Sequence, residues 1–180
     1  MMLRICGAAA ALALSACGER GVMAEIERAE KNAGAQADDA GAGAQAFLDA
    51  QRGRAGVEAQ PSGLLLEFKA RGPNQGLPRP PAEATVLVHY EGKLADGSVF
   101  DSSFARGEPA EFPLQGVVPG FAEAIQLMRP GDEIVAYLPA ELGYGAAGSP
   151  PAIPPNAVLQ FRIVLLAYQG ADGRVVQAPR

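Results

Sequence analysis

Two runs shape this 180-residue chain: Val88-His89-Tyr90-Glu91-Gly92 and Val99-Phe100-Asp101-Ser102-Ser103. In the first run Val88 and Tyr90 face one side and His89 the other, which is typical of a strand with one buried face. Asp96-Gly97 lies between the runs, and this dipeptide favours the tight turn of a hairpin. The sequence therefore predicts two antiparallel strands that carry aromatic rings and one carboxylate.

Similar alternation outside this hairpin predicts further strands, at residues 64–68, 134–138 and 159–165. A single helix is predicted at 121–128, where apolar residues recur at helical spacing between two Pro-Gly pairs. We therefore expect an α+β fold, in which a twisted antiparallel sheet of about five to six strands wraps over one short α-helix. A helical and flexible N-terminal arm should precede it.

The start of the chain predicts export. Arg4 precedes an apolar run at 5–14 that is too short to span a bilayer, and Leu14-Ser15-Ala16-Cys17 is similar to a bacterial lipobox. We expect residues 1–16 to be a lipoprotein signal peptide and Cys17 to carry acyl chains; the alternative is an ordinary signal peptide that ends near a cysteine. The expected location is the bacterial cell envelope. Because Gly18 rather than aspartate follows Cys17, an outer-membrane anchor facing the periplasm is favoured.

Residues 17–61 predict an arm rich in alanine and glycine between this anchor and the domain. Short apolar stripes at 22–29 and 44–52 predict two short helices, with a flexible linker at 33–43. The arm could be a spacer or could pair two chains; the thin stripes favour the spacer, and thus a monomer or a weak dimer. We expect the folded domain at 62–168 and a polar tail at 169–180.

The composition argues against several function classes. The net charge is −5 and no stripe of Lys or Arg appears, so nucleic acid is not an expected partner. His89 is the single histidine, and both cysteines, Cys6 and Cys17, lie within the first 17 residues, which are not part of the predicted fold. We therefore predict no metal site and no cofactor.

Nucleophilic catalysis is also disfavoured, because a Ser102-His89-Asp101 triad would require His89 to turn through its own sheet. What remains is a set of aromatic residues: Tyr90, Phe100, Phe112, Phe121, Tyr144 and Phe161. Rings at alternating positions usually belong to a core. Here, however, two hydroxyls and the neighbouring Asp101 carboxylate would need polar partners if buried. This combination predicts an apolar pocket with a few placed polar groups.

At this point the chain resembles the FKBP-type peptidyl-prolyl cis-trans isomerases, and within them the branch of macrophage infectivity potentiator-like bacterial lipoproteins. The resemblance covers about residues 62–168 in consistent order. The motifs that carry it are Val88-His89-Tyr90-x-Gly92, Asp96-Gly97-x-x-Phe100-Asp101-Ser102-Ser103, Val117-Val118-Pro119-Gly120-Phe121, Leu142-Gly143-Tyr144-Gly145 and Ile153-Pro154-Pro155-Asn156.

The resemblance implies a role for each matching residue. Phe121 would be the pocket floor beneath the substrate proline, where the family usually has tryptophan. Apolar walls would come from Tyr90, Phe100 and Phe161, and Phe112 would also contact the substrate. Val117 and Val118 would line one side, with their backbone groups contacting the peptide. Tyr144 would donate its hydroxyl to a substrate carbonyl, helped by the Ile153 backbone. Asp101 would accept a hydrogen bond from Tyr90 and pair with Arg106.

The function implied is rotation of X-Pro peptide bonds in envelope proteins, with proline-containing polypeptides as partners. The alternative is a non-catalytic binding module or chaperone of the same fold. Ala110, Ser149 and Ala152 replace larger residues of some family members, so we expect a wider pocket that binds macrolide inhibitors weakly.

Overall fold

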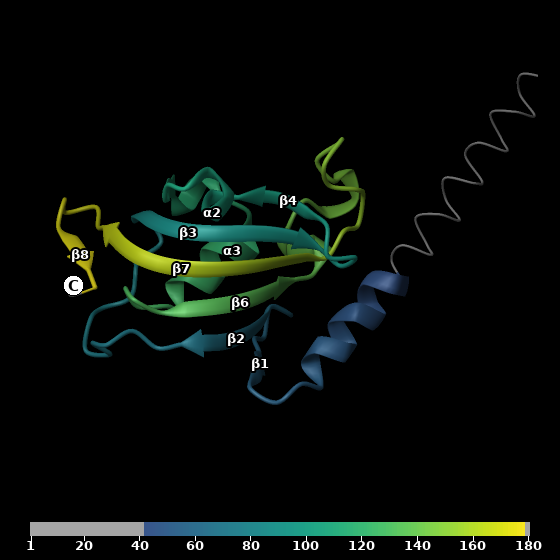
Figure 1. The fold of residues 1–180 in the computed structure, drawn as a ribbon, viewed down its shortest axis with the longest axis horizontal. Helices are drawn as coiled ribbons and strands as arrows, with labels where there is room; N and C mark the ends of the chain where they lie inside the picture. Colours follow the sequence, from purple (N-terminus) through teal and green to yellow (C-terminus); the bar gives the residue numbers. More distant parts are fainter. Residues whose placement is uncertain (1–41, 179–180) are drawn as a thin grey trace, which may run out of the picture. The chain divides into compact units, whose positions relative to one another are not determined.

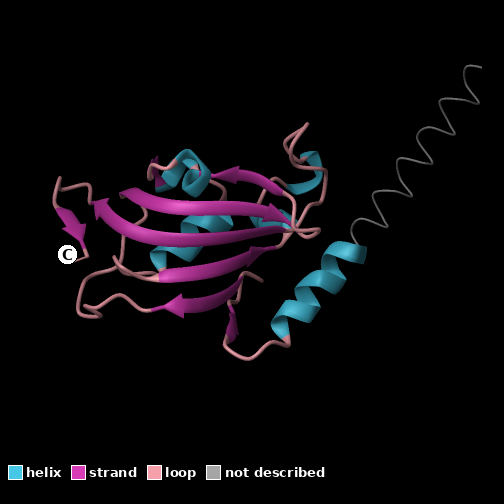
Figure 2. Cartoon of the chain, viewed as in Figure 1, coloured by secondary structure: helices cyan, strands magenta, loops and turns pink. Residues whose placement is uncertain are grey.

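The computed structural model describes residues 42–178. They form one antiparallel sheet in the order β1-β2-β6-β7-β3-β4, with β5 paired to β3 and β8 paired to β7 (Figures 1 and 2). The strands are β1 Val57–Ala59, β2 Leu65–Ala70, β3 Thr85–Leu94, β4 Val99–Ser102, β5 Ala110–Pro113, β6 Glu133–Leu138, β7 Leu159–Gln169 and β8 Val175–Gln177. The helices are 42–52, α2 Ser103–Arg106 and α3 Pro119–Gln126, with short 3-10 turns η1 Leu114–Gly116, η2 Ala140–Leu142 and η3 Gly145–Ala147.

The predicted α+β class is confirmed, but the sheet has eight strands rather than five to six. The strands that the patterns named above do not include are β1 and β8, each three residues long, and the four-residue β5. β1 lies before residue 62 and β8 lies within 169–180, so the sheet extends past both predicted limits of the domain. Segments this short carry too little alternation to be recognised, and they form because a longer strand offers its edge.

The predicted hairpin consists of β3 and β4. Along β3 the inward residues Val86, Val88, Tyr90 and Gly92 are buried, and those between them are half-buried. Gly97 closes the turn at φ +88, in the left-handed region that favours glycine. β3 also pairs with β7 along its whole length, from Thr85 opposite Gln169 to Leu94 opposite Leu159. The two longest strands thus hold the centre of the sheet.

Helix α3 covers the inner face of the sheet, behind β3, β7 and β6 in Figure 1. Pro119 begins it, where the missing N–H has no cost, and Phe121, Ala124 and Ile125 form its buried side. A Cβ on Gly120 would stand 2.6 Å from Leu138 Cγ, so the helix packs here as closely as a glycine allows. A helix this short would not be stable by itself in water. Its stability comes from packing, because burying each large apolar side chain contributes about 1.5–3 kcal/mol.

The outer face carries a second, smaller cluster around the helix at 42–52. Its buried members are Leu48, Leu65, Val135, Tyr137 and Val158. The Phe47 and Tyr137 rings meet edge to face at 6.0 Å. The helix predicted at 44–52 is therefore present, and it packs on the domain rather than standing apart from it. Predictions for residues 1–41, including Cys17, lie outside the described residues.

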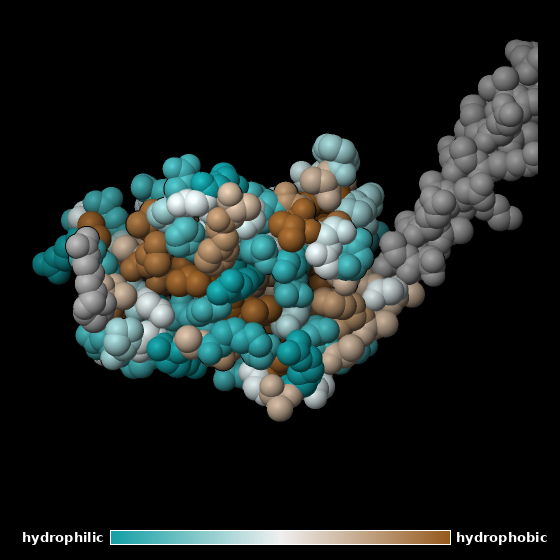
Figure 3. All heavy atoms as spheres, in the orientation of Figure 1, coloured by the Kyte–Doolittle hydropathy of each residue, from teal (hydrophilic) through white to brown (hydrophobic). Residues whose placement is uncertain are grey.

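Elsewhere the outer face mixes apolar and polar side chains, as the brown and teal atoms in Figure 3 show. Of the helices that the structure describes, none combines the length and the apolar character that crossing a bilayer requires.

Candidate functional site

A cavity of about 280 Å³ opens between the inner face of the sheet and the start of α3. The residues that line it are Tyr90, Phe100, Asp101, Phe112, Gly116, Val117, Val118, Phe121, Tyr144 and Phe161. They come from β3, β4, β5, β7, α3 and the loops beside them. Segments far apart in the sequence therefore build this hollow together.

Phe121 forms its floor, with only 4% of the residue exposed. Three rings meet Phe121 edge to face: Phe161 at 5.1 Å, Tyr90 at 6.0 Å and Phe112 at 6.2 Å between centroids. Edge-to-face pairs contribute beyond their buried area because a positive ring edge meets a negative ring face. The floor is therefore held from three sides by rings on different strands.

Phe100 and Phe161 form a second wall, with centroids 5.6 Å apart and planes at 90°. Phe161 lies on central β7 and is buried, whereas Phe100 lies on short β4 and is half-buried. The fold therefore constrains the Phe161 ring more than the Phe100 ring.

A network of three polar side chains stands at one edge of the cavity. The Tyr90 hydroxyl donates to Asp101 Oδ2, and Arg106 Nη1 donates to Asp101 Oδ1 at 2.5 Å. Arg106 Nη2 also donates to the Tyr90 hydroxyl at 3.2 Å. The phenol is therefore both donor and acceptor, and its ring is fixed at the oxygen as well as by packing.

Helix α2 places Arg106 in this network. The Ser102 side chain accepts a hydrogen bond from Ala105 N and begins the helix, and Gly107 ends it at φ +78. One short turn of helix thus brings Arg106 back toward Asp101, five residues before it.

The network moves the pKa values of its acids apart. Burial and the hydrogen bond to Asp101 raise the pKa of the Tyr90 phenol above its ordinary value. Burial also pushes the pKa of the Asp101 carboxyl upward, but hydrogen bonds from Tyr90 and Arg106 outweigh it and the pKa lies below its ordinary value. At neutral pH the phenol is therefore protonated and the carboxylate is charged.

Tyr144 stands at the rim of the cavity, with 41% of the residue exposed. No hydrogen bond joins its hydroxyl to another of the described residues, so this donor is free to meet a ligand. Val117 and Val118 lie half-buried just before α3 and complete the lining.

The structure brings most predicted site residues together, with two exceptions. Arg106 does not line the cavity and acts on it through Asp101 and Tyr90. Ile153 is buried in the core, and its backbone N–H donates to Ser149 O at 2.9 Å within the loop. Ile153 O accepts from Ser149 N at 2.8 Å, so both groups of the Ile153 backbone, which was predicted to help Tyr144, have partners within this loop.

Sequence reasoning missed Gly116, which lines the cavity with backbone alone. No side-chain signal marks such a residue; only its place just before Val117 could have drawn attention to it.

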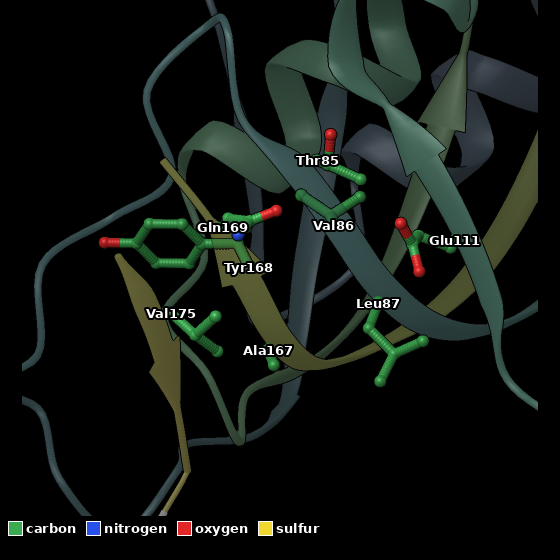
Figure 4. Close-up of a pocket in the computed structure, with 8 residues that line it drawn as sticks. All are labelled: Thr85, Val86, Leu87, Glu111, Ala167, Tyr168, Gln169 and Val175. Atoms are coloured by element: carbon green, nitrogen blue, oxygen red, sulfur yellow. The ribbon is translucent and has the colours of Figure 1, made fainter. Parts of the chain in front are cut away.

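A second hollow, of about 190 Å³, lies where β3, β7 and β8 meet (Figure 4). Its lining includes Leu87, Ala167, Val175 and a single acid, Glu111. The Tyr168 hydroxyl points away from Glu111 in this view, so the polar groups do not converge. Within residues 42–178, no cluster of three or more His, Cys, Asp or Glu residues is suitable for binding a metal ion.

Comparison with known proteins gives a consistent result. Residues 77–166 match the family model described as FKBP-type peptidyl-prolyl cis-trans isomerase. An FKBP-type 22 kDa peptidyl-prolyl cis-trans isomerase of Escherichia coli is 47% identical over 121 residues, which are 67% of this chain and 57% of the relative. The Mip isomerase of Coxiella burnetii is 40% identical, over 69% of this chain and 53% of that protein.

Solved structures agree. FkpA of Escherichia coli superposes with a TM-score of 0.71 at 34% identity, over 89% of this chain and 72% of that one. A peptidyl-prolyl cis-trans isomerase of Pseudomonas syringae superposes at 0.67 and 31% identity, over 73% of this chain and 94% of that one. The chain spans about half the length of the curated relatives it matches.

Proposed function

Since this chain belongs to the family of FKBP-type peptidyl-prolyl cis-trans isomerases, we propose that it catalyses rotation about X-Pro peptide bonds in polypeptides. The resemblance drawn from the sequence motifs is confirmed by the family match. The observation that carries the proposal is the cavity above Phe121, with its aromatic walls and the ordered Tyr90–Asp101–Arg106 network.

The chemistry of the peptide bond suits such a cavity. The planar amide resists rotation by about 18–20 kcal/mol because its C–N bond has partial double-bond character. Of all peptide bonds, X-Pro has the sizeable cis population that makes isomerisation relevant to folding. At the twisted transition state the resonance is lost and the carbonyl oxygen carries less negative charge. Apolar walls favour that less polar state relative to water.

Each lining residue has its own role in holding the substrate. Phe121 supports the proline ring from below, while Phe112 and Phe161 exclude water from the sides. Tyr144 donates its free hydroxyl to a carbonyl of the bound peptide. Arg106 and Asp101 are positioning residues, because they hold the Tyr90 ring and reach the substrate only through it.

The energy required is modest. A 10⁴-fold acceleration corresponds to about 5.5 kcal/mol, which shape and a few oriented hydrogen bonds can supply. No proton transfer or covalent intermediate is involved, and among residues 42–178 those that line the cavity include no serine, cysteine or histidine.

The location and the partners are part of the same proposal. Cys17 follows a lipobox-like run, so we propose a lipid-anchored protein of the bacterial envelope, in the outer membrane, that acts on proline-containing polypeptides there. It is a monomer or a weak dimer, and its wider pocket binds macrolides weakly. In the sequence, helix 42–52 follows the proposed anchor, and its Phe47 ring contacts Tyr137 of the sheet.

The test is the cis-to-trans rate of a short Leu-Pro peptide, followed by magnetisation-exchange NMR at micromolar protein. We expect clear acceleration, and faster refolding of a model protein limited by proline isomerisation. Phe161→Leu should lower kcat/KM about tenfold, since it removes a ring that contacts both Phe100 and Phe121.

Phe47→Leu is the matched control, because the same change on the outer face lies far from the cavity lining. Its rate should equal that of the wild type. An unchanged isomerisation rate with the wild-type protein, together with measurable peptide binding, would instead support a non-catalytic binding module or chaperone of this fold.

A further inference from the structure

Gly92 occupies an inward position on β3 where the alternation calls for a side chain. It is buried and pairs with Asp101 on β4 and with Phe161 on β7. Its φ is not among the positive values of this chain, so the backbone itself does not require glycine here. The reason for glycine must lie in what stands above it.

Two rings of the cavity wall occupy that space. A Cβ on Gly92 would lie 2.4 Å from Phe100 Cζ, 2.6 Å from Phe100 Cε2 and 2.9 Å from Phe161 Cε1. Real Cβ atoms essentially never approach other atoms so closely. Phe100 and Phe161 therefore lean over bare backbone, and their edge-to-face contact depends on the missing side chain.

The two rings would not yield equally to a side chain at this position. Phe161 is buried on β7, which is paired on both sides by β3 and β6. Phe100 is half-buried on the four-residue β4, and the β3–β4 register shifts between Gly92 and Lys93. Phe100 is consequently the ring that would move, and much of its movement would be into solvent and the cavity mouth.

We propose that Gly92 is a positioning residue of the site: its lack of a side chain places the Phe100 wall and so sets the width of the cavity. This inference rests on the proposed function for its kinetic consequence, but its geometry does not. A side chain at residue 92 should displace Phe100 and weaken peptide binding, while the rest of the sheet keeps its structure.

The test is Gly92→Ala, measured by KM and kcat for the Leu-Pro peptide. We expect KM to rise about tenfold with kcat within about twofold, since the wall acts on binding. Gly43→Ala is the control, because a Cβ there would meet no atom within 4 Å, and it should change neither constant. An unchanged KM in a folded Gly92→Ala protein would overturn the proposal.

A second-site change separates this role from general damage. Phe100→Leu removes the two ring atoms nearest to the added Cβ, Phe100 Cζ and Cε2, and leaves Phe161 Cε1 at 2.9 Å. Adding Gly92→Ala to Phe100→Leu should therefore raise KM by much less than the tenfold expected for Gly92→Ala alone. If the KM increases caused by the two substitutions multiply in the double variant, Gly92 does not act through Phe100 and the inference is wrong.

NMR decides the geometry even where turnover is absent. In the wild type, the Gly92 Hα resonances should be shifted by the Phe100 ring, and Phe100–Phe161 NOEs should be strong. Phe100→Leu should reduce that shift to the part that the Phe161 ring causes, whether or not Gly92→Ala folds. Unshifted Hα resonances in the wild type would refute the placement of the rings, whereas loss of turnover alone would count against the proposed function.

Discussion

The Tyr144 hydroxyl is the free donor at the mouth of the cavity, and its removal is the simplest test of how a substrate carbonyl is held. Tyr144→Phe should lower kcat/KM about three- to tenfold, because one hydrogen bond contributes about 0.5–1.5 kcal/mol. The thermal midpoint should not change, since the hydroxyl is exposed. Tyr168→Phe, which deletes a hydroxyl outside the cavity, should leave the rate unchanged; equal effects of the two changes would exclude this role.

The Asp101 carboxylate makes a pH-dependent contribution to stability. Its folded pKa lies below the ordinary 3.8, so the unfolded chain binds the proton more readily. The contribution is therefore present above the unfolded pKa and is lost as pH falls through the folded value. Urea unfolding of wild type and Asp101→Asn should differ at pH 6 and converge at about pH 2.

Glu83→Gln provides the charge-matched control for that series, because Glu83 is exposed and outside the cavity lining. Its stability should follow the wild type across the range. A gap between wild type and Asp101→Asn that widens toward low pH would contradict the assigned direction of the pKa shift.

Between elements, the turn after α3 is tied to the loop after β2 by one fully buried carboxylate. Asp132 accepts hydrogen bonds from Gly72 N at 2.6 Å, Gln75 Nε2 at 2.9 Å and Arg129 N at 2.9 Å. A Cβ on Gly72 would lie 2.7 Å from Pro130 O, so the two segments touch backbone to backbone. Because the close backbone contact leaves no room for water, the Asp132 carboxylate accepts the hydrogen bonds of the N–H groups buried there.

Asp132→Ala should therefore lower the free energy of unfolding by about 2–4 kcal/mol, because it strands buried donors. Asp172→Ala is the matched change: this exposed carboxylate accepts from Arg174 N, where water can replace it. It should cost no more than about 0.5 kcal/mol. Similar losses in urea unfolding would show that burial is not the cause.

At the same scale, β1 and β8 show why the element count exceeded the prediction. Neither strand has a pattern of its own: β1 forms because Val57 can pair opposite Glu67, and β8 because Val175 can pair opposite Gln169. Such short strands form because a neighbouring strand has an unpaired edge, and no local periodicity in the sequence predicts them.

For the whole molecule, the prediction tests the lipid anchor proposed at Cys17. In a bacterial host, full-length protein should incorporate labelled fatty acid and sediment with membranes, and Cys17→Ala should move it to the soluble fraction. Cys6→Ala is the matched control and should remain with membranes. A Cys17→Ala protein that stays membrane-bound and labelled would overturn the lipid anchor.

Local patterns in the sequence were enough for the class of fold, the long strands, α3 and the set of rings around the cavity. Each of these depends on a period within one segment, as in Val86, Val88 and Tyr90 along β3. A period of two or of 3.6 residues reports which face is buried, and burial supplies most of the folding free energy. The residue types alone also indicated a dry pocket with few polar groups.

Tertiary structure alone decided how those groups meet. It placed Arg106 against the Tyr90 hydroxyl, engaged the Ile153 amide with Ser149 and brought two rings over Gly92. No local period in the sequence reports these contacts, and a gap of about 0.5–1 Å already removes a quarter to a half of a packing contact's attraction. Distances of that kind are set only when every strand and loop has packed at interior density.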